Sequence, residues 1–448
     1  MDLLKSIFKG DKVIWIIFMF LCLISIIEVF SASSTLTYKS GDHWGPITQH
    51  SIFLMIGTVV VVFFHNIPYR WFQVLPVFML PISVVLLIVV MFMEKVNDAA
   101  RFIPLFGFQF QPSEFAKMAV VIATAFILSK GQTEEGANPK AFKHIMWITA
   151  IICGLIFPEN FSTAALLFGT VFLMMFIGRV AMRKLFILTG VLVGIAIVGI
   201  LTLELTKGMD LPLTHRFDTW RTRIEKFASN EKVPAAKFDT DRDGQVGHAR
   251  IAVATSNVLG KGPGNSVQRD FLSQAYSDFI YAIVIEELGL VGGTFVAFLY
   301  IILLIRAGRI AKKCGHSFPT FLVLGIALLL VTQALFNMMV AVGIAPVTGQ
   351  PLPLISRGGT STIINCVYIG MILSVSRYAA ALEEERKRQE AEQRLLIAQR
   401  EHDAQIPLLI DGLPDSNNSQ AQSGAQPTAK IFNSDTEFEI DEDDDNKG

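Results

Sequence analysis

The feature that most constrains this chain is a series of about ten apolar segments, each near the length that crosses a lipid bilayer. Of the 448 residues, 52% are hydrophobic and 17% are charged, whereas soluble domains are about one quarter charged. Lipid cannot satisfy open backbone groups, so segments of this length favour helices. The predicted fold is therefore an all-α polytopic membrane protein. Window hydropathy places its spans at about residues 13–30, 50–64, 72–92, 115–128, 145–157, 163–177, 185–203, 279–305, 318–342 and 360–375.

Basic residues in the short connecting segments predict the orientation of these spans. Cytoplasmic segments of membrane proteins carry an excess of Lys and Arg, and on one predicted side of this chain they include Lys9, Arg70, Lys130, Lys143, Arg183, Lys312 and Arg377. Both termini are therefore expected in the cytoplasm. Residues 206–277, between the seventh and eighth spans, become a large extracytoplasmic loop, and a polar loop of that size is usually functional.

Three parts are expected along the chain. Residues 1–380 are predicted to form a membrane domain. Its first apolar segment is predicted to be a retained transmembrane helix rather than a cleavable signal. Residues 381–404 are rich in Glu, Arg, Gln and Ala and predict a charged cytoplasmic helix. Residues 405–448 lack the apolar content to fold and predict a disordered acidic tail. The formal net charge is −1, and without a basic patch the chain offers nothing for a nucleic-acid partner.

A helix-start pattern opens the fourth span, where Gln111 and a proline precede Glu114 and Lys117. Glu114 and Lys117 are three residues apart, so they share a helix face. One interpretation is a cap with an internal ion pair. The other is a functional site, since ionisable residues at membrane depth are usually functional.

A second polar feature separates the last two spans. Residues 348–361 contain two prolines and three glycines, and they include Ser356, Arg357, Gly358 and Gly359. Irregular backbone at membrane depth is tolerated where it lines a cavity or packs on protein. Its amides and Arg357 are candidates for holding phosphate or sugar oxygens, and a structural re-entrant turn is the alternative.

A third feature is acidic and lies at the head of the eighth span. Asp278 stands where the long polar segment ends, and Glu286 follows eight residues later, near the same helix face. Unpaired carboxylates are costly in lipid, so these side chains are expected to face the bundle interior or a wet cavity. For Glu287 a structural ion pair is the alternative.

A fourth feature resembles half of a calcium-binding loop. Asp239, Asp241 and Asp243 precede Gly244, but the position where such a loop needs its bidentate Glu is Arg250. A solvated acidic turn is therefore favoured over a metal site here.

As a set, these residues resemble the SEDS family of polytopic cell-wall proteins, which includes FtsW, RodA and the sporulation protein SpoVE. The chain departs from the family pattern at Arg357, where an aromatic residue is usual, and at 158–164, which has an extra residue and no Gly. The matching segments are residues 30–33, 111–117, 158–164, 216–227, 260–262, 277–280, 286–289 and 346–359.

The resemblance implies a peptidoglycan glycosyltransferase that polymerises lipid II at the outer face of the cytoplasmic membrane. The family's essential aspartate maps onto Asp278, which would act as general base toward the acceptor sugar's 4-hydroxyl. The leaving lipid pyrophosphate calls for a cation, and no organic cofactor is expected, although a divalent cation such as Mg²⁺ or Mn²⁺ would serve. The expected substrate-binding residues are Gln111, Glu114, Lys117, Arg101, Arg216, Glu286, Ser356, Arg357, Gly358 and Gly359.

The resemblance also implies partners and a place of action. These are a class B penicillin-binding protein (a transpeptidase), other divisome proteins and the membrane lipid of a bacterial inner membrane. A septal, FtsW-like role is favoured over a RodA-like role in the lateral wall, because of residues 30–33 and the long polar tail. Two alternatives stay open, a lipid II flippase and a scaffold that only activates the transpeptidase.

Overall fold

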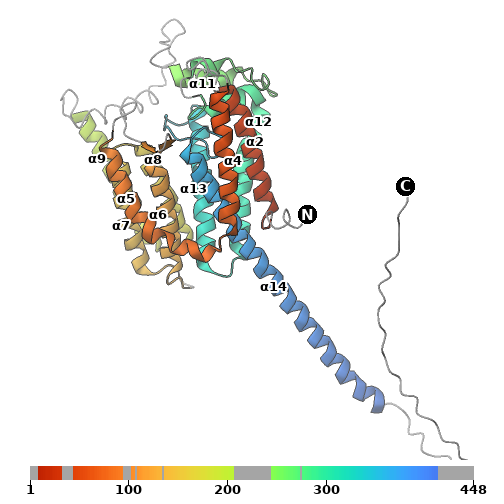
Figure 1. The fold of residues 1–448 in the computed structure, drawn as a ribbon. Coiled ribbons are helices and arrows are strands. Elements are labelled where there is room, and N and C mark those ends of the chain that lie inside the picture. The colour runs from red at the N-terminus through yellow and green to blue at the C-terminus, as the bar shows by residue number, and fades with distance from the viewer. Residues whose placement is uncertain are drawn as a thin grey trace, which may run out of the picture. The chain divides into compact units, whose positions relative to one another are not determined.

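A computed structural model describes residues 9–32, 44–93, 102–105, 108–133, 136–205, 244–272 and 275–411 of the chain. This described part is helical almost throughout (Figure 1). The long helices are α2 (Lys12–Ala32), α4 (Gly45–Asn66), α5 (Leu75–Met91), α6 (Pro112–Ser129), α7 (Pro139–Ile156), α8 (Phe161–Ile177), α9 (Met182–Leu205), α12 (Ile280–Lys313), α13 (Ser317–Ala341) and α14 (Thr360–Asp411). The shorter ones are η1 (Tyr69–Gln73), α11 (Gly244–Thr255) and η3 (Gln268–Phe271).

The helices fall where the apolar segments predict them, which confirms the all-α membrane fold. In the described residues eight helices are long and apolar enough to cross a membrane, and α5 and α8 are shorter apolar helices. The fourth and fifth predicted spans begin earlier than hydropathy indicates, at Pro112 and Pro139. The full count of about ten spans and the cytoplasmic placement of both termini stay predictions.

Local sequence explains several of the helix starts. Asn138 and Asn160 are the N-caps of α7 and α8, and their side chains accept hydrogen bonds from Lys140 N (2.9 Å) and Thr163 N (3.1 Å). Proline, which lacks the N–H that a first turn leaves unpaired, occupies the first position of α6 and α7. These polar caps define the residues at which the helices begin, which hydropathy alone locates only approximately.

Among the described helices, α6, α13 and the apolar part of α14 are the most buried. α6 packs against α5, α7, α8 and α13, while α13 packs against α6, α8 and α12. Nearly every side chain of α6 from Ser113 to Ala125 is buried, whereas α9 is exposed along most of its described length. Polar groups on α6 and α13 are therefore enclosed by protein, and any charge there needs a protein partner.

A short hairpin and a helical segment connect these helices. Strands β1 (Ile103–Leu105) and β2 (Phe108–Phe110) pair antiparallel just before α6. α11 and η3 belong to the predicted extracytoplasmic loop, and both α11 and the residues that follow it lie against the start of α12 (Figure 1). Residues 206–243 and 273–274 of that loop lie outside the described residues.

The chain divides into one compact unit, residues 1–387, and a second of residues 388–448. The membrane helices all begin in the first unit. In the second, helix α14 continues to Asp411, beyond the predicted end of the charged helix at Ala404. Residues 405–411, expected in the tail, are thus helical, and residues after 411 lie outside the described part.

Candidate functional site

Asp278 lies in a turn, residues 275–279, that leads directly into α12. The turn passes into the helix through a hydrogen bond from Ala282 N to the Phe279 carbonyl (2.9 Å). The Asp278 side chain is half-buried, and Ser277 Oγ donates to its carboxylate at 3.1 Å. A carboxylate at a helix N-terminus is favoured by the helix dipole.

Three consecutive backbone carbonyls of this turn accept hydrogen bonds from distant parts of the chain. In order, Arg357 N donates to the Tyr276 carbonyl (2.9 Å), Ser356 Oγ to the Ser277 carbonyl (2.7 Å) and Asn337 Nδ2 to the Asp278 carbonyl (2.9 Å). The structure thus brings the predicted residues Asp278, Ser356 and Arg357 together, although they come from two separate polar segments.

The segment that supplies Ser356 and Arg357 is irregular and tightly held. Leu354 has a positive φ of 66°, which costs a residue with a side chain about 1–3 kcal/mol. Its neighbour Ile355 accepts a hydrogen bond from Ser25 Oγ of α2 (2.7 Å), and Ser356 Oγ accepts one from Leu352 N (2.7 Å). Strain of this kind is concentrated at functional sites and persists only where surrounding contacts enforce it.

Arg357 brings a positive charge close to the Asp278 turn. Its guanidinium donates to Gln49 of α4 (2.7 Å) and lies over the Tyr276 ring, with 5.7 Å to the ring centroid. Burial lowers the pKa of Arg357 below its ordinary value, while Tyr276 acts the other way. An arginine stays charged despite such a shift. Gly358 and Gly359 follow at the start of α14, where the Gly358 carbonyl accepts from Ser361 N (2.8 Å).

Glu114 and Lys117 form an ion pair inside the bundle. Their side chains are 1% and 0% exposed, with 2.7 Å between Lys117 Nζ and Glu114 Oε1. Lys117 also donates to Gln333 of α13 (2.8 Å), and Gln333 donates to the Pro351 carbonyl (3.0 Å). The internal pair anticipated from their spacing is therefore present. Substrate binding by these two side chains stays a prediction.

Gln111 is the N-cap of α6 and lies half-buried beside the start of α14. Its backbone N–H donates to Thr360 Oγ1 (3.4 Å), and its side-chain amide donates to Ser113 Oγ (3.2 Å). This places Gln111 next to the glycines that precede α14, and its role toward substrate also stays a prediction.

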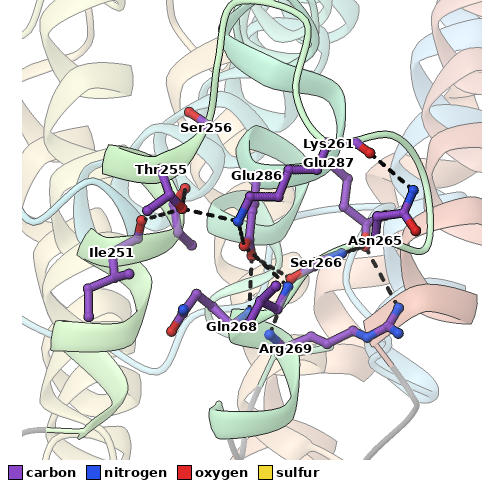
Figure 2. Close-up of polar contacts among 12 residues, drawn as sticks. Ile251, Thr255, Ser256, Lys261, Asn265, Ser266, Gln268, Arg269, Glu286 and Glu287 are labelled. Atoms are coloured by element: carbon purple, nitrogen blue, oxygen red, sulfur yellow. Dashed lines mark hydrogen bonds and ion pairs between the residues drawn. The ribbon is translucent and has the colours of Figure 1, made fainter.

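Glu286 and Glu287, which we call the carboxylate anchor, hold the segment after α11 against α12 (Figure 2). Both side chains are 0% exposed. The Glu286 carboxylate accepts from Lys261 Nζ (2.5 Å), Ser266 Oγ (2.5 Å), Val267 N (3.2 Å) and Gln268 N (3.3 Å). The Glu287 carboxylate accepts from Gly264 N (2.8 Å), Ser266 N (3.1 Å) and Ser31 Oγ, and lies 3.9 Å from Arg269.

The contacts of the anchor explain why Glu286 and Glu287 can both be buried. Glu286 was predicted to bind substrate, but in this structure its carboxylate accepts hydrogen bonds from protein donors. The structural ion pair considered for Glu287 is present, with Arg269 as the partner. A buried carboxylate with several hydrogen bonds and a cation is fully compensated. We therefore interpret the anchor as a device that holds the extracytoplasmic segment to α12, and the substrate role of Glu286 stays a prediction.

A break in α12 reinforces this attachment. Gly289 has φ 72° and ψ −174°, which interrupts the helix and frees backbone groups on both sides. The carbonyls of Glu286 and Glu287 accept from Lys261 N (3.0 Å) and Gly262 N (2.8 Å). A Cβ on Gly289 would collide with the backbone of Gly260, so the close approach requires glycine at both positions.

The remaining predicted residues, Arg101, Arg216, Asp239, Asp241 and Asp243, lie outside the described residues. Within the described ranges no three His, Cys, Asp or Glu side chains gather as metal ligands.

Sequence reasoning missed two amide side chains on α13, Gln333 and Asn337. They are 2% and 1% exposed, and both donate to carbonyls of residues 350–351. A signal was present, because two amides four residues apart share one face of an otherwise apolar helix. It was overlooked because amides carry no charge.

Comparisons with known proteins place the chain in a family. The model of the FtsW/RodA/SpoVE family, described as cell cycle proteins, matches residues 11–381. A probable peptidoglycan glycosyltransferase FtsW of Geobacter sulfurreducens is 30% identical over 378 residues, which cover 83% of this chain and 96% of that protein. Stage V sporulation protein E of Bacillus subtilis is 29% identical over 377 residues, with 82% and 97% covered.

A solved structure shares the fold. One chain of a peptidoglycan synthase complex, described for its structural coordination of polymerization and crosslinking, superimposes with a TM-score of 0.64. The identity is 22%, and the match covers 83% of this chain and 98% of the solved one. At this identity the likeness extends to the fold of the membrane helices.

Proposed function

Since the chain belongs to the FtsW/RodA/SpoVE family of cell cycle proteins, we propose that it is a peptidoglycan glycosyltransferase that polymerises lipid II. The reaction takes place at the outer face of the bacterial cytoplasmic membrane, where the sugars of the lipid-linked substrate lie in water and its tail lies along the helices. The observation that carries the proposal is Asp278, a half-buried carboxylate at the head of α12 whose turn is fixed to the Ser356 and Arg357 segment.

The proposed chemistry is a single displacement. The Asp278 carboxylate removes the proton from the acceptor's 4-hydroxyl while that oxygen forms a bond to the donor's anomeric carbon. The bond from this carbon to the lipid pyrophosphate breaks, and its electron pair leaves with the pyrophosphate. One displacement inverts the anomeric centre, so an α-linked donor yields a β-linked product. The proton on Asp278 then passes to water, which restores the carboxylate.

The second requirement of the reaction is to stabilise the negative charge on the leaving pyrophosphate. A guanidinium presents paired N–H donors that match phosphate oxygens, and Arg357 lies on the segment attached to the Asp278 turn. Arg357 is therefore the described residue best placed to receive the pyrophosphate. A divalent cation such as Mg²⁺ or Mn²⁺ would supply the same stabilisation of the pyrophosphate.

The partners follow from the same family. A related fold occurs in a peptidoglycan synthase complex that coordinates polymerization with crosslinking, which supports a class B penicillin-binding protein as the transpeptidase partner. The close relatives named FtsW support septal wall synthesis in the inner membrane, together with other divisome proteins, over lateral-wall synthesis.

The test is polymerisation of labelled lipid II by the purified protein with its transpeptidase, comparing wild type with Asp278→Ala and Asp278→Asn. A matched control is Glu383→Gln, which removes a carboxylate that pairs with Lys313 at the opposite end of α12. We expect polymer from wild type and from the control, and none from either Asp278 variant. Equal polymer from all four proteins would exclude Asp278 as base. No polymer from wild type, with head-group translocation intact in vesicles, would favour the flippase.

A further inference from the structure

Asn337 is a buried amide with an unusual pair of partners. It lies on α13, one helical turn after Gln333, and is 1% exposed. Its side-chain nitrogen donates to the Asp278 carbonyl (2.9 Å) and to the Gln350 carbonyl (2.8 Å). A side-chain amide carries two N–H donors, so each carbonyl takes one and the orientation of the side chain is set.

The two carbonyls belong to different segments, the turn that holds Asp278 and the irregular segment that precedes Arg357. The turn that holds Asp278 is also bonded by Ser356 and Arg357, but both donors lie on the same irregular segment as Gln350. These contacts join the turn to the irregular segment, but they do not attach the turn to α13. Asn337 makes that attachment, because it stands on α13, which packs against α6, α8 and α12 in the buried part of the bundle.

The same face of α13 fixes the irregular segment a second time. Gln333 donates to the Pro351 carbonyl (3.0 Å) and accepts from Lys117 (2.8 Å), whose partner is Glu114. One helix therefore holds the segment at both Gln350 and Pro351. Of the two amides, Asn337 is the one that contacts the peptide of Asp278 itself.

We propose that Asn337 is a positioning residue for Asp278, which fixes the general base against α13 and in register with the Ser356 and Arg357 segment. Proton transfer needs the base within hydrogen-bond reach of the acceptor hydroxyl. A displacement of about 1 Å costs a reaction of this kind about 100-fold in rate. The inference rests on the proposed function, since it concerns the base of that reaction.

A positioning role differs from simple stabilisation in what a substitution changes. A base that is displaced but chemically intact lowers kcat, while substrate contacts elsewhere keep KM unchanged. Loss of packing alone lowers stability and the amount of folded enzyme, and leaves kcat per folded molecule as it was.

The experiment compares wild type, Asn337→Leu and Asn337→Ala in lipid II polymerisation with the transpeptidase present. Leu keeps the number and branching of the side-chain heavy atoms and removes both donors, and Ala serves as the second variant if the bulkier Leu does not fold. The control is Thr332→Val, since the Thr332 hydroxyl bonds within α13 to the Leu328 carbonyl (2.6 Å). Each protein is quantified as folded enzyme, and hydrogen exchange of residues 275–282 is followed by mass spectrometry.

We expect the Asn337 variants to lose about 10- to 100-fold in kcat, with KM within about twofold of wild type. Exchange at residues 275–282 should be faster, and the Thr332 variant should match wild type in all measurements. Unchanged kcat per folded enzyme, or a change confined to KM, would overturn the inference while leaving the proposed function intact. An inactive wild type would instead remove the proposed function and the inference with it.

Discussion

Replacement of Lys117 by Met tests whether the buried ion pair of α6 is a structural element of the bundle. The Met side chain keeps most of the volume of Lys117 and removes its charge. Glu114 then stays in the protein interior, where its oxygens have no hydrogen-bond donor other than Lys117 among the described residues. Lys117 is its partner at 2.7 Å, and both side chains are at most 1% exposed.

The expected loss of stability follows from this burial. Removing one partner of a buried ion pair costs about 3–5 kcal/mol, because the remaining charge is uncompensated. In the double variant Lys117→Met and Glu114→Leu, no charge remains, and the main cost is the unpaired Gln333 acceptor, worth about 1–3 kcal/mol. The double variant should therefore be more stable than Lys117→Met by about 2 kcal/mol.

The assay is equilibrium unfolding of the purified variants in mixed detergent micelles, followed by tryptophan fluorescence and helical circular dichroism. A loss below about 1 kcal/mol for Lys117→Met, or a double variant less stable than the single one, would refute the reasoning. The double variant also tests the predicted substrate role, because a folded protein that lacks both charges should bind lipid II more weakly if either side chain contacts it.

Three further predictions concern other parts of the bundle. Gly289→Ala should destabilise the fold more than Gly264→Ala, since both glycines have positive φ but only Gly289 meets another backbone; equal losses of unfolding free energy would contradict this. Lys261→Met should cost less than about 3 kcal/mol, because Glu286 keeps its bonds to one hydroxyl and two backbone amides, and a larger loss in the same assay would contradict it. Burial raises the pKa of the Cys314 thiol to about 11, so its neutral form persists at high pH. In a variant without the other cysteines, iodoacetamide labelling should therefore accelerate about tenfold per unit from about pH 8 to pH 10, whereas a plateau near pH 9 would contradict it.

The helical membrane fold was predictable from local patterns in the sequence. Apolar length and helix caps are local properties, so segments such as 112–129 and 161–177 are readable from their own residues. The ion pair of Glu114 and Lys117 was also readable, because a spacing of three places both on one face of a helix. Asp278 was found from the motif around it, and its place at the head of α12 agrees with the boundary between polar and apolar residues.

The groups that contact these residues come from distant parts of the chain and could not be predicted from local patterns. Asn337 is 59 residues from Asp278, and Ser31 is 256 residues from Glu287, so no local pattern relates either pair. The position of Glu286 in the sequence predicted a substrate-binding residue, yet its carboxylate accepts hydrogen bonds from the segment after α11. The physical reason is that a buried carboxylate must find donors wherever packing brings them. That packing depends on how α2, α12 and α13 come together, which hydropathy and spacing along one helix do not specify.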